Sequence, residues 1–127
     1  MNIIGIGTDI TEISRIDRMT ARHADYFLHR VFTDAELAYS LSAKRSGERL
    51  AGRWAAKEAV LKALGTGWAA GISWQDVEVT RDASGKPDIR LHGAAQKVAD
   101  SLGISHIFIS ISHCDCHAIA YAIAVSQ

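Results

Sequence analysis

The segment Ser46–Leu64 constrains the fold more than any other part of this chain. Wound as a helix at about 100° per residue, it carries large apolar side chains on one side. These are Leu50, Trp54, Leu61 and Leu64, and the other side carries Ala51, Ala55, Ala59 and Ala63. A helix that is apolar over most of its surface must be covered on two sides. We therefore predict a long, packed helix that ends at Gly65, a residue type typical of helix C-termini.

The same segment carries charged side chains within its apolar sectors, namely Arg49, Arg53, Lys57, Glu58 and Lys62. Such charges need partners, because burying an unpaired charge is costly. One interpretation is a Glu58–Lys62 ion pair along the helix, beside a solvated stripe of cations. The other is a polyphosphate site, in which the cations bind phosphate oxygens and Glu58 holds a divalent metal ion.

The rest of the sequence predicts one α+β domain over residues 1–127. Thr33 and Glu36 have capping-box spacing, which predicts that a helix begins at Asp34. The predicted strands are Asn2–Gly7, Val77–Arg81, Pro87–Leu91, His106–Ser112 and Ala118–Val125, and the other helices are Thr11–Arg22, Asp34–Ala43 and Ala94–Leu102. Because strands and helices come in blocks, a small antiparallel or mixed sheet packed on the long helix is favoured over a parallel α/β sheet.

Charge and hydropathy narrow the function classes. Lys plus Arg and Asp plus Glu number 14 each, so the balance argues against bulk nucleic-acid binding. No apolar run reaches the ~20 residues of a membrane helix, and the N-terminus lacks the pattern of a signal peptide. Cys114 and Cys116 are one residue apart, a spacing unusual for a structural disulfide. We expect a cytoplasmic protein with reduced thiols.

Asp9 directly follows the first predicted strand. Its carboxylate could cap a helix that begins near Thr11, or it could bind a ligand at the end of the strand. Mg²⁺ usually takes one or two protein carboxylates together with water and phosphate oxygens. Asp9 and Glu58 would form such a site if the fold brings them together.

The segment His113-Cys114-Asp115-Cys116-His117 is a further candidate site. Its residue types are zinc ligands, but the spacing is poor for a zinc site. A catalytic thiol needs a base and a lowered pKa, and nothing in the segment requires either. The remaining interpretations are a polar hairpin turn and a phosphate-binding role for His113.

Five blocks together resemble the motifs of the short holo-acyl-carrier-protein synthases. They are residues 5–16 (GIGTDITEISRI), 32–37 (FTDAEL), 53–67 (RWAAKEAVLKALGTG), 85–87 (GKP) and 111–113 (ISH). The similarity covers nearly the whole chain, and the block 53–67 is the most specific. The resemblance implies the 4′-phosphopantetheinyl transferase fold. It also implies Mg²⁺-dependent transfer of phosphopantetheine from coenzyme A to a serine of apo-acyl carrier protein, releasing adenosine 3′,5′-bisphosphate.

Residue roles follow from the resemblance by position. Asp9 and Glu58 match the Mg²⁺ ligands, and Lys62 joins them as a catalytic residue. The matched coenzyme A-binding residues are Arg53, Lys57, Lys62, Gly65, Thr66, Ser112 and His113. The matched carrier-docking residues are Arg15, Met19 and Arg22. The resemblance further implies a homotrimer with sites between subunits, and it leaves the general base open between Glu58 and Glu36.

One departure concerns Cys114, which stands where the resembled family often has a small hydroxyl residue. Cys116 and His117 are also unfamiliar at this place. The resemblance therefore assigns no role to these three residues.

Overall fold

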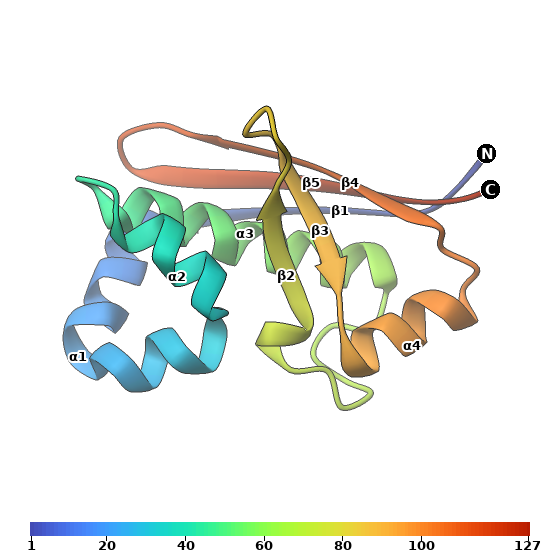
Figure 1. Ribbon diagram of the computed structural model, residues 1–127, viewed down its shortest axis with the longest axis horizontal. Helices are drawn as coiled ribbons and strands as arrows, with labels where there is room; N and C mark the ends of the chain where they lie inside the picture. Colours follow the sequence, from blue (N-terminus) through green and yellow to red (C-terminus); the bar gives the residue numbers. More distant parts are fainter.

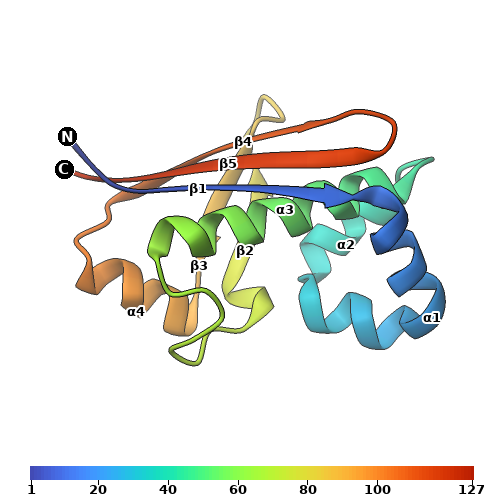
Figure 2. The same ribbon diagram turned by 180° about the vertical axis from the view of Figure 1, so that it is seen from behind.

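The computed structural model describes all 127 residues, and its central element is helix α3 (Ser46–Leu64). A three-stranded sheet covers one side of this helix, and a two-stranded hairpin and the other helices surround the rest (Figures 1 and 2). The first sheet contains β1 (Asn2–Glu12), β4 (His106–His113) and β5 (His117–Ser126), in the order β1-β5-β4 with antiparallel neighbours. The second contains β2 (Val77–Arg81) and β3 (Pro87–Leu91).

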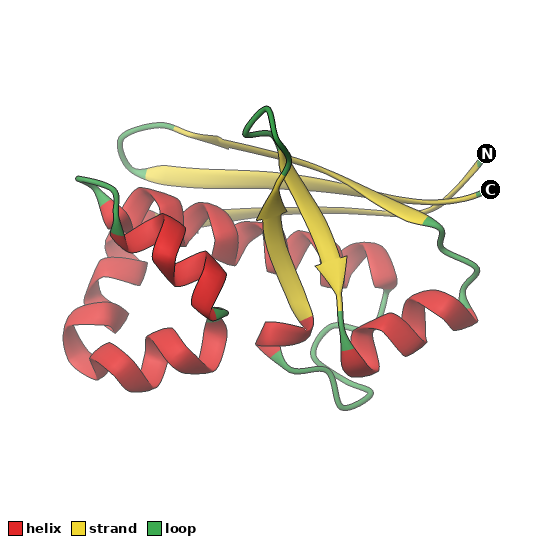
Figure 3. Cartoon of the chain, in the orientation of Figure 1, coloured by secondary structure: helices red, strands yellow, loops and turns green.

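The other helices are α1 (Ile13–Val31), α2 (Asp34–Leu41) and α4 (Gly93–Ser101), and a short 3₁₀ turn spans Trp74–Asp76. Helices and strands therefore alternate in blocks, as Figure 3 shows, and the predicted α+β class is confirmed. No helix is both long enough and apolar enough to cross a lipid bilayer.

Small residues allow the sheet to lie directly on α3. A Cβ atom added at Gly5 or Gly7 of β1 would fall 1.9 or 1.8 Å from the carbonyl oxygen of Ala63 or Ala59, respectively. The inward-facing residues of β5 are all fully buried alanines: Ala118, Ala120, Ala122 and Ala124. Backbone contact this close excludes water between helix and sheet, which explains why α3 carries alanine on this side.

The predicted ends of α3 are confirmed, and Gly65 adopts a left-handed conformation with φ +80°. The capping box between Thr33 and Glu36 is also present at the start of α2. Both features are local: a left-handed residue favours glycine, and a capping box needs only four neighbouring residues.

The N-terminal elements differ from the prediction. β1 continues to Glu12, since it pairs with β5 along its whole length, so Asp9 lies inside a strand rather than after it. α1 begins at Ile13 and runs to Val31 through a break at Ala24, where φ is 39°. Asp9 does not cap this helix, because its carboxylate accepts a hydrogen bond from the Thr11 hydroxyl at 2.7 Å.

The first strand is buried on one face only. Its glycines face α3, whereas its isoleucines face outward, and Ile6 and Ile10 are each 65% exposed. Neighbouring strands add further exposed apolar side chains to this outer face, namely Phe108, Tyr121 and Ile123. One chain therefore presents an apolar sheet face with nothing packed on it.

Candidate active site: a carboxylate pair and an arginine-lined cavity

The fold brings Asp9 and Lys62 together across the β1–α3 contact. The Lys62 ammonium donates a hydrogen bond to the Thr8 carbonyl at 2.8 Å and lies 3.5 Å from Asp9 Oδ1. Lys62 therefore pairs with Asp9 rather than forming a helix ion pair with Glu58. More than half of its side chain is exposed, so the ammonium remains accessible to a ligand.

Glu58 lies one helical turn before Lys62 and within electrostatic reach of Asp9. Burial raises the pKa of Glu58; the Trp68 indole N–H opposes this shift, and the Asp9 charge adds to it, so the pKa lies above its usual range. Two carboxylates that repel each other form a natural site for a cation. No group of three or more acidic, histidine or cysteine side chains in the structure is arranged to hold a metal. Asp9 and Glu58 are the side chains that could hold a cation here, and Mg²⁺ commonly takes only one or two protein carboxylates beside water and phosphate oxygens.

Lys57 lies elsewhere, and its position contradicts the predicted role in ligand binding. Its side chain is fully buried, and its ammonium is 2.9 Å from the Glu36 carboxylate. It also donates hydrogen bonds to the carbonyls of Trp74 and Val77, so all three of its N–H groups are used internally. The partner Glu36 is equally inaccessible, because it also accepts hydrogen bonds from the backbone of Thr33 and Val79. These two charges compensate each other inside the fold, and a substrate cannot reach them.

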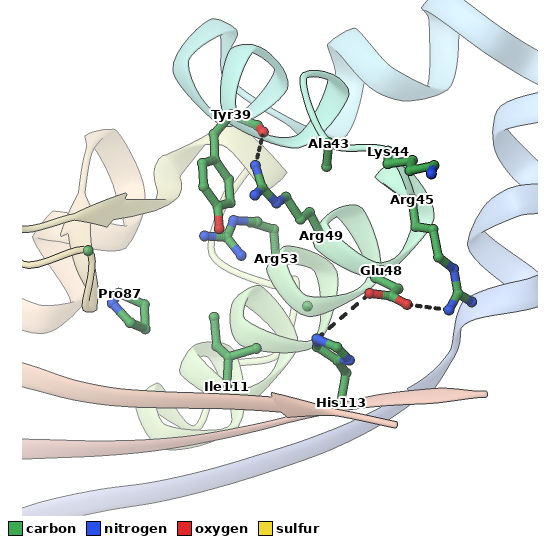
Figure 4. A pocket seen from close by; sticks show the side chains of 12 residues that line it. Tyr39, Ala43, Lys44, Arg45, Glu48, Arg49, Arg53, Pro87, Ile111 and His113 are labelled. Carbon is green, nitrogen blue, oxygen red and sulfur yellow. Dashed lines mark hydrogen bonds and ion pairs between the residues drawn. The ribbon is translucent and has the colours of Figure 1, made fainter. Parts of the chain in front are cut away.

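A cavity of about 580 Å³ opens between the start of α3, the α2–α3 loop, the β2–β3 turn and β4 (Figure 4). Its lining residues are Tyr39, Ala43, Lys44, Arg45, Glu48, Arg49, Gly52, Arg53, Gly85, Pro87, Ile111 and His113. Four cationic side chains from the α2–α3 loop and α3 face this space against the single carboxylate of Glu48. That carboxylate pairs with Arg45 at 2.6 Å and lies 3.8 Å from His113 Nε2.

Arginines gather around Tyr39 at the wall of this cavity. The guanidinium carbons of Arg49 and Arg53 lie 4.1 and 4.2 Å from the centre of the phenol ring, and that of Arg81 also lies 4.2 Å from it. None of the three forms an ion pair with a carboxylate in the structure, and Arg53 is only 7% exposed. Burial lowers the pKa of Arg53, which reflects the cost of holding this charge without an anion. Cations in this arrangement suit a phosphate ligand.

The cavity and the carboxylate pair lie on different sides of α3. Glu58 follows Arg53 by five residues, which turns the helix by about 140° between them. Asp9, Glu58 and Lys62 are all absent from the cavity lining. Gly65 and Thr66 follow Lys62 at the C-terminal end of α3, and so belong to the carboxylate side.

The predicted residues of β4 lie on two different faces of the sheet. Ile111 and His113 both line the cavity, but Ser112 lies between them and faces the opposite side of the sheet by strand alternation. The polar cavity residues that sequence reasoning missed are Tyr39, Lys44, Arg45 and Glu48. The one sequence signal for them was the Lys44-Arg45 pair just before α3.

The turn after His113 shows no metal geometry. Cys114 and Cys116 are exposed free thiols, and the Cys114 N–H donates a hydrogen bond to the His117 carbonyl at 2.9 Å. The segment is therefore a polar hairpin turn, and the zinc interpretation has no support in the structure.

The predicted docking residues lie along the first part of α1. Arg15 and Arg22 are exposed, and the Arg15 guanidinium lies 5.5 Å from the Trp54 ring centre. Met19 lines a mainly apolar pocket of about 200 Å³. The rest of that pocket is formed by His23, Tyr26, Phe27, Arg30, Val31, Trp54 and Trp74. An apolar pocket flanked by arginines suits a partner that presents an apolar side chain among acidic groups.

Comparison with known proteins identifies the class. A model of the 4′-phosphopantetheinyl transferase superfamily matches residues 5–124. The chain therefore belongs to this superfamily, and it is an enzyme of the phosphopantetheinyl transferase type.

Individual relatives narrow the class to the holo-[acyl-carrier-protein] synthases. The protein of that name from Moorella thermoacetica is 50% identical over 121 residues, covering 95% of this chain and 93% of the relative. The crystal structure of the Neisseria meningitidis synthase superposes with a TM-score of 0.90 at 35% identity, covering 98% of this chain and all of that one. The Bacillus anthracis synthase in complex with coenzyme A (3′,5′-ADP) superposes with a TM-score of 0.81 at 36% identity, covering 98% of both chains.

Proposed function

We propose that this chain transfers the 4′-phosphopantetheine arm of coenzyme A to a serine of apo-acyl carrier protein, releasing adenosine 3′,5′-bisphosphate in an Mg²⁺-dependent reaction. The observation that carries the proposal is a cavity lined by Arg49 and Arg53, which have no carboxylate partner, together with a separate pair of mutually repelling carboxylates. The names of the relatives and the coenzyme A complex among the similar structures support it.

The cavity is the proposed site of the adenosine end of coenzyme A. Arg49, Arg53 and Lys44 supply the charge for phosphate groups, and His113 at the rim binds the 3′-phosphate. Pro87 and Ile111 offer apolar surface to the adenine ring. The pantetheine arm then runs past Gly65 and Thr66. Gly65 has no side chain, so the arm can approach the backbone closely.

Asp9 and Glu58 are the proposed Mg²⁺ ligands. The bound ion would neutralise negative charge on the pyrophosphate. Lys62 binds the same phosphates, because its exposed ammonium can turn from the Thr8 carbonyl toward a ligand. Glu58 is the proposed proton acceptor for the carrier serine, because the other candidate, Glu36, is closed off by the fold.

The α1 surface is the proposed dock for acyl carrier protein. Arg15 and Arg22 would attract its acidic groups, and the pocket lined by Met19 would take an apolar side chain from it. We further propose that the protein acts in the cytoplasm, since its two exposed cysteines form no disulfide.

A homotrimer with sites between subunits would unite the two half-sites. The cavity and the carboxylates lie on different sides of α3, and a neighbouring copy would bring its own carboxylates next to the cavity of the first chain. The bare outer face of the β1-β5-β4 sheet offers an apolar contact surface for neighbouring copies. We expect Ile6→Asp to yield monomers in analytical ultracentrifugation and to abolish transfer. A trimeric, active Ile6→Asp variant would overturn the shared-site arrangement.

The decisive experiment is mass spectrometry of apo-acyl carrier protein after incubation with this chain, coenzyme A and Mg²⁺. We expect a mass gain of one phosphopantetheine group, and no gain in the presence of a chelator. Asp9→Asn and Glu58→Gln should each abolish the gain in folded protein. Glu12→Gln is the matched control, because this exposed carboxylate lies on the opposite face of the same strand. Near-normal transfer by either site variant would refute the metal assignment.

A further inference from the structure

Glu48 is the single carboxylate among the cationic side chains that line the large cavity. Its Oε1 atom lies 2.6 Å from the Arg45 guanidinium, and its Oε2 atom lies 3.8 Å from His113 Nε2 (Figure 4). Arg49 and Arg53 line the same cavity but pair with no carboxylate. Two groups of the cavity that can bind an anion are therefore already next to an anion of the protein itself.

The position of Glu48 is set by α3 and not by a loop. Glu48 lies in the first turn of this helix, and its side chain is only 19% exposed. The preceding Gly47 is buried, and a Cβ atom there would collide with the Asp17 carboxylate of α1. The side chains of Arg45 and His113, by contrast, are more than half exposed. The carboxylate is thus the fixed member of the cluster, and its two partners are free to turn toward a ligand.

A phosphate group makes the same demand on Arg45 and His113 as the Glu48 carboxylate does, because both anions accept hydrogen bonds and carry negative charge. A phosphate that binds to these two side chains must take the place of the carboxylate and remain close to it. Like charges brought together in this way weaken binding. An acidic residue also stabilises the first turn of a helix, but that role does not require the carboxylate to face His113 across the cavity.

We propose that Glu48 is an internal competitor of the 3′-phosphate of coenzyme A: it pairs with Arg45 and His113 in the free protein and is displaced from them when that phosphate binds. The inference rests on the proposed function, because it takes the cavity as the site of the adenosine end. Coenzyme A and the product adenosine 3′,5′-bisphosphate both carry the 3′-phosphate, so Glu48 weakens the binding of both. Weaker binding of this uniform kind does not slow the chemical step, and it speeds the release of product.

The test is isothermal titration of the protein with adenosine 3′,5′-bisphosphate. Glu48→Gln keeps the shape of the side chain and removes its charge, so we expect about five- to tenfold tighter binding, the effect of removing a like charge about 4 Å away in a wet site. If Glu48→Gln binds this ligand as weakly as the parent protein, or more weakly, the proposal is overturned. Should Glu48→Gln fail to fold, Glu48→Ser removes the same charge with a residue type that helix N-termini favour.

Asp34→Asn is the matched control. It removes the same charge from the first turn of α2, and Asp34 is exposed and absent from the cavity lining. We expect its affinity for adenosine 3′,5′-bisphosphate to stay within about twofold of the parent, because salt screens surface charges outside the site. Equal tightening in Asp34→Asn and Glu48→Gln would overturn the proposal, since net charge alone would then explain the gain. A purely structural role of Glu48 predicts lower stability in thermal unfolding, but no tighter binding.

Adenosine 5′-monophosphate, which lacks the 3′-phosphate, locates the effect. We expect this ligand to bind equally to the parent and to Glu48→Gln, and equal tightening of both ligands would overturn the competition for the 3′-phosphate. In steady-state transfer, Glu48→Gln should lower the KM for coenzyme A without raising kcat, as expected when uniform binding is strengthened. A higher KM would show that Glu48 contributes to coenzyme A binding, and would overturn the proposal.

The parent protein separates this inference from the proposed function. If the parent binds adenosine 3′,5′-bisphosphate no better than adenosine 5′-monophosphate, the proposed adenosine site is wrong, and the role of Glu48 is overturned with it. If the parent prefers the bisphosphate and Glu48→Gln does not bind it more tightly, only the role of Glu48 is overturned.

Discussion

Replacing Lys57 by methionine isolates the effect of breaking the buried ion pair with Glu36. The side chains of both residues are completely inaccessible to solvent, and their charged atoms are 2.9 Å apart. The substitution keeps the length of the side chain but leaves the Glu36 carboxylate buried without a counter-ion. Removing one partner of such a pair typically costs about 3–5 kcal/mol.

That loss is a large part of the ~5–15 kcal/mol that separates folded from unfolded domains. At roughly 4 °C per kcal/mol for a chain of this size, the melting temperature should fall by about 12–20 °C. Lys97→Met is the matched control, because Lys97 is exposed on α4, and its melting temperature should stay close to that of the parent.

The double variant Glu36→Leu with Lys57→Met should recover most of the loss. Burial lowers the pKa of Lys57 despite the nearby Glu36 charge, so desolvation outweighs the attraction within the pair. A well-packed apolar pair of similar volume removes both charges and therefore avoids this desolvation cost.

Circular dichroism on heating measures stability, and isothermal titration with coenzyme A below the transition measures binding. We expect folded Lys57→Met to bind coenzyme A with an affinity close to that of the parent. An unchanged melting temperature would refute the energetic argument. Loss of coenzyme A binding by the folded variant would instead restore Lys57 to the ligand site.

Three further changes test other parts of the structure. Gly7→Ala would place a Cβ 1.8 Å from the Ala59 carbonyl oxygen, so β1 must shift, and thermal unfolding should show a loss of about 1–3 kcal/mol. Burial would raise the pKa of Glu78, but hydrogen bonds from Thr33 and His92 outweigh this effect and hold the pKa below its usual range. These hydrogen bonds stabilise the folded protein while Glu78 is ionised, and that stability is lost as the pH falls through the lowered pKa. Glu78→Gln should therefore reduce the loss of stability on acidification, as measured by denaturant titrations at several pH values. Arg15→Glu should raise the KM for acyl carrier protein but not for coenzyme A in steady-state transfer assays; an unchanged carrier KM would remove the docking proposal.

Local chemistry let the sequence alone predict the ends of α3 and the start of α2. The limits Ser46–Leu64 follow from a two-sided apolar pattern ended by Gly65, and the capping box of Thr33 needs only its own neighbours. The β2–β3 hairpin was predictable for the same reason, since its strands and turn are adjacent in the chain.

Only the tertiary structure decided the roles of the charged residues on α3. Lys57 and Glu58 are neighbours in the sequence, yet Lys57 points into the core toward Glu36 while Glu58 lies within electrostatic reach of Asp9. The helical periodicity showed that each charge sits in an apolar sector, but not which element covers that sector. Long-range packing makes that choice: β2 and α2 cover Lys57, whereas the glycines of β1 bring Asp9 beside Glu58.

The cavity could not be predicted from the sequence, because it too depends on long-range packing. Its walls come from α2, α3, the β2–β3 turn and β4, which are far apart in the chain. The sequence determined that α3 carries more cations than its apolar setting can accept without partners. In the tertiary structure these cations have different roles: Lys57 pairs with the buried Glu36 carboxylate, whereas Arg49 and Arg53 line the cavity.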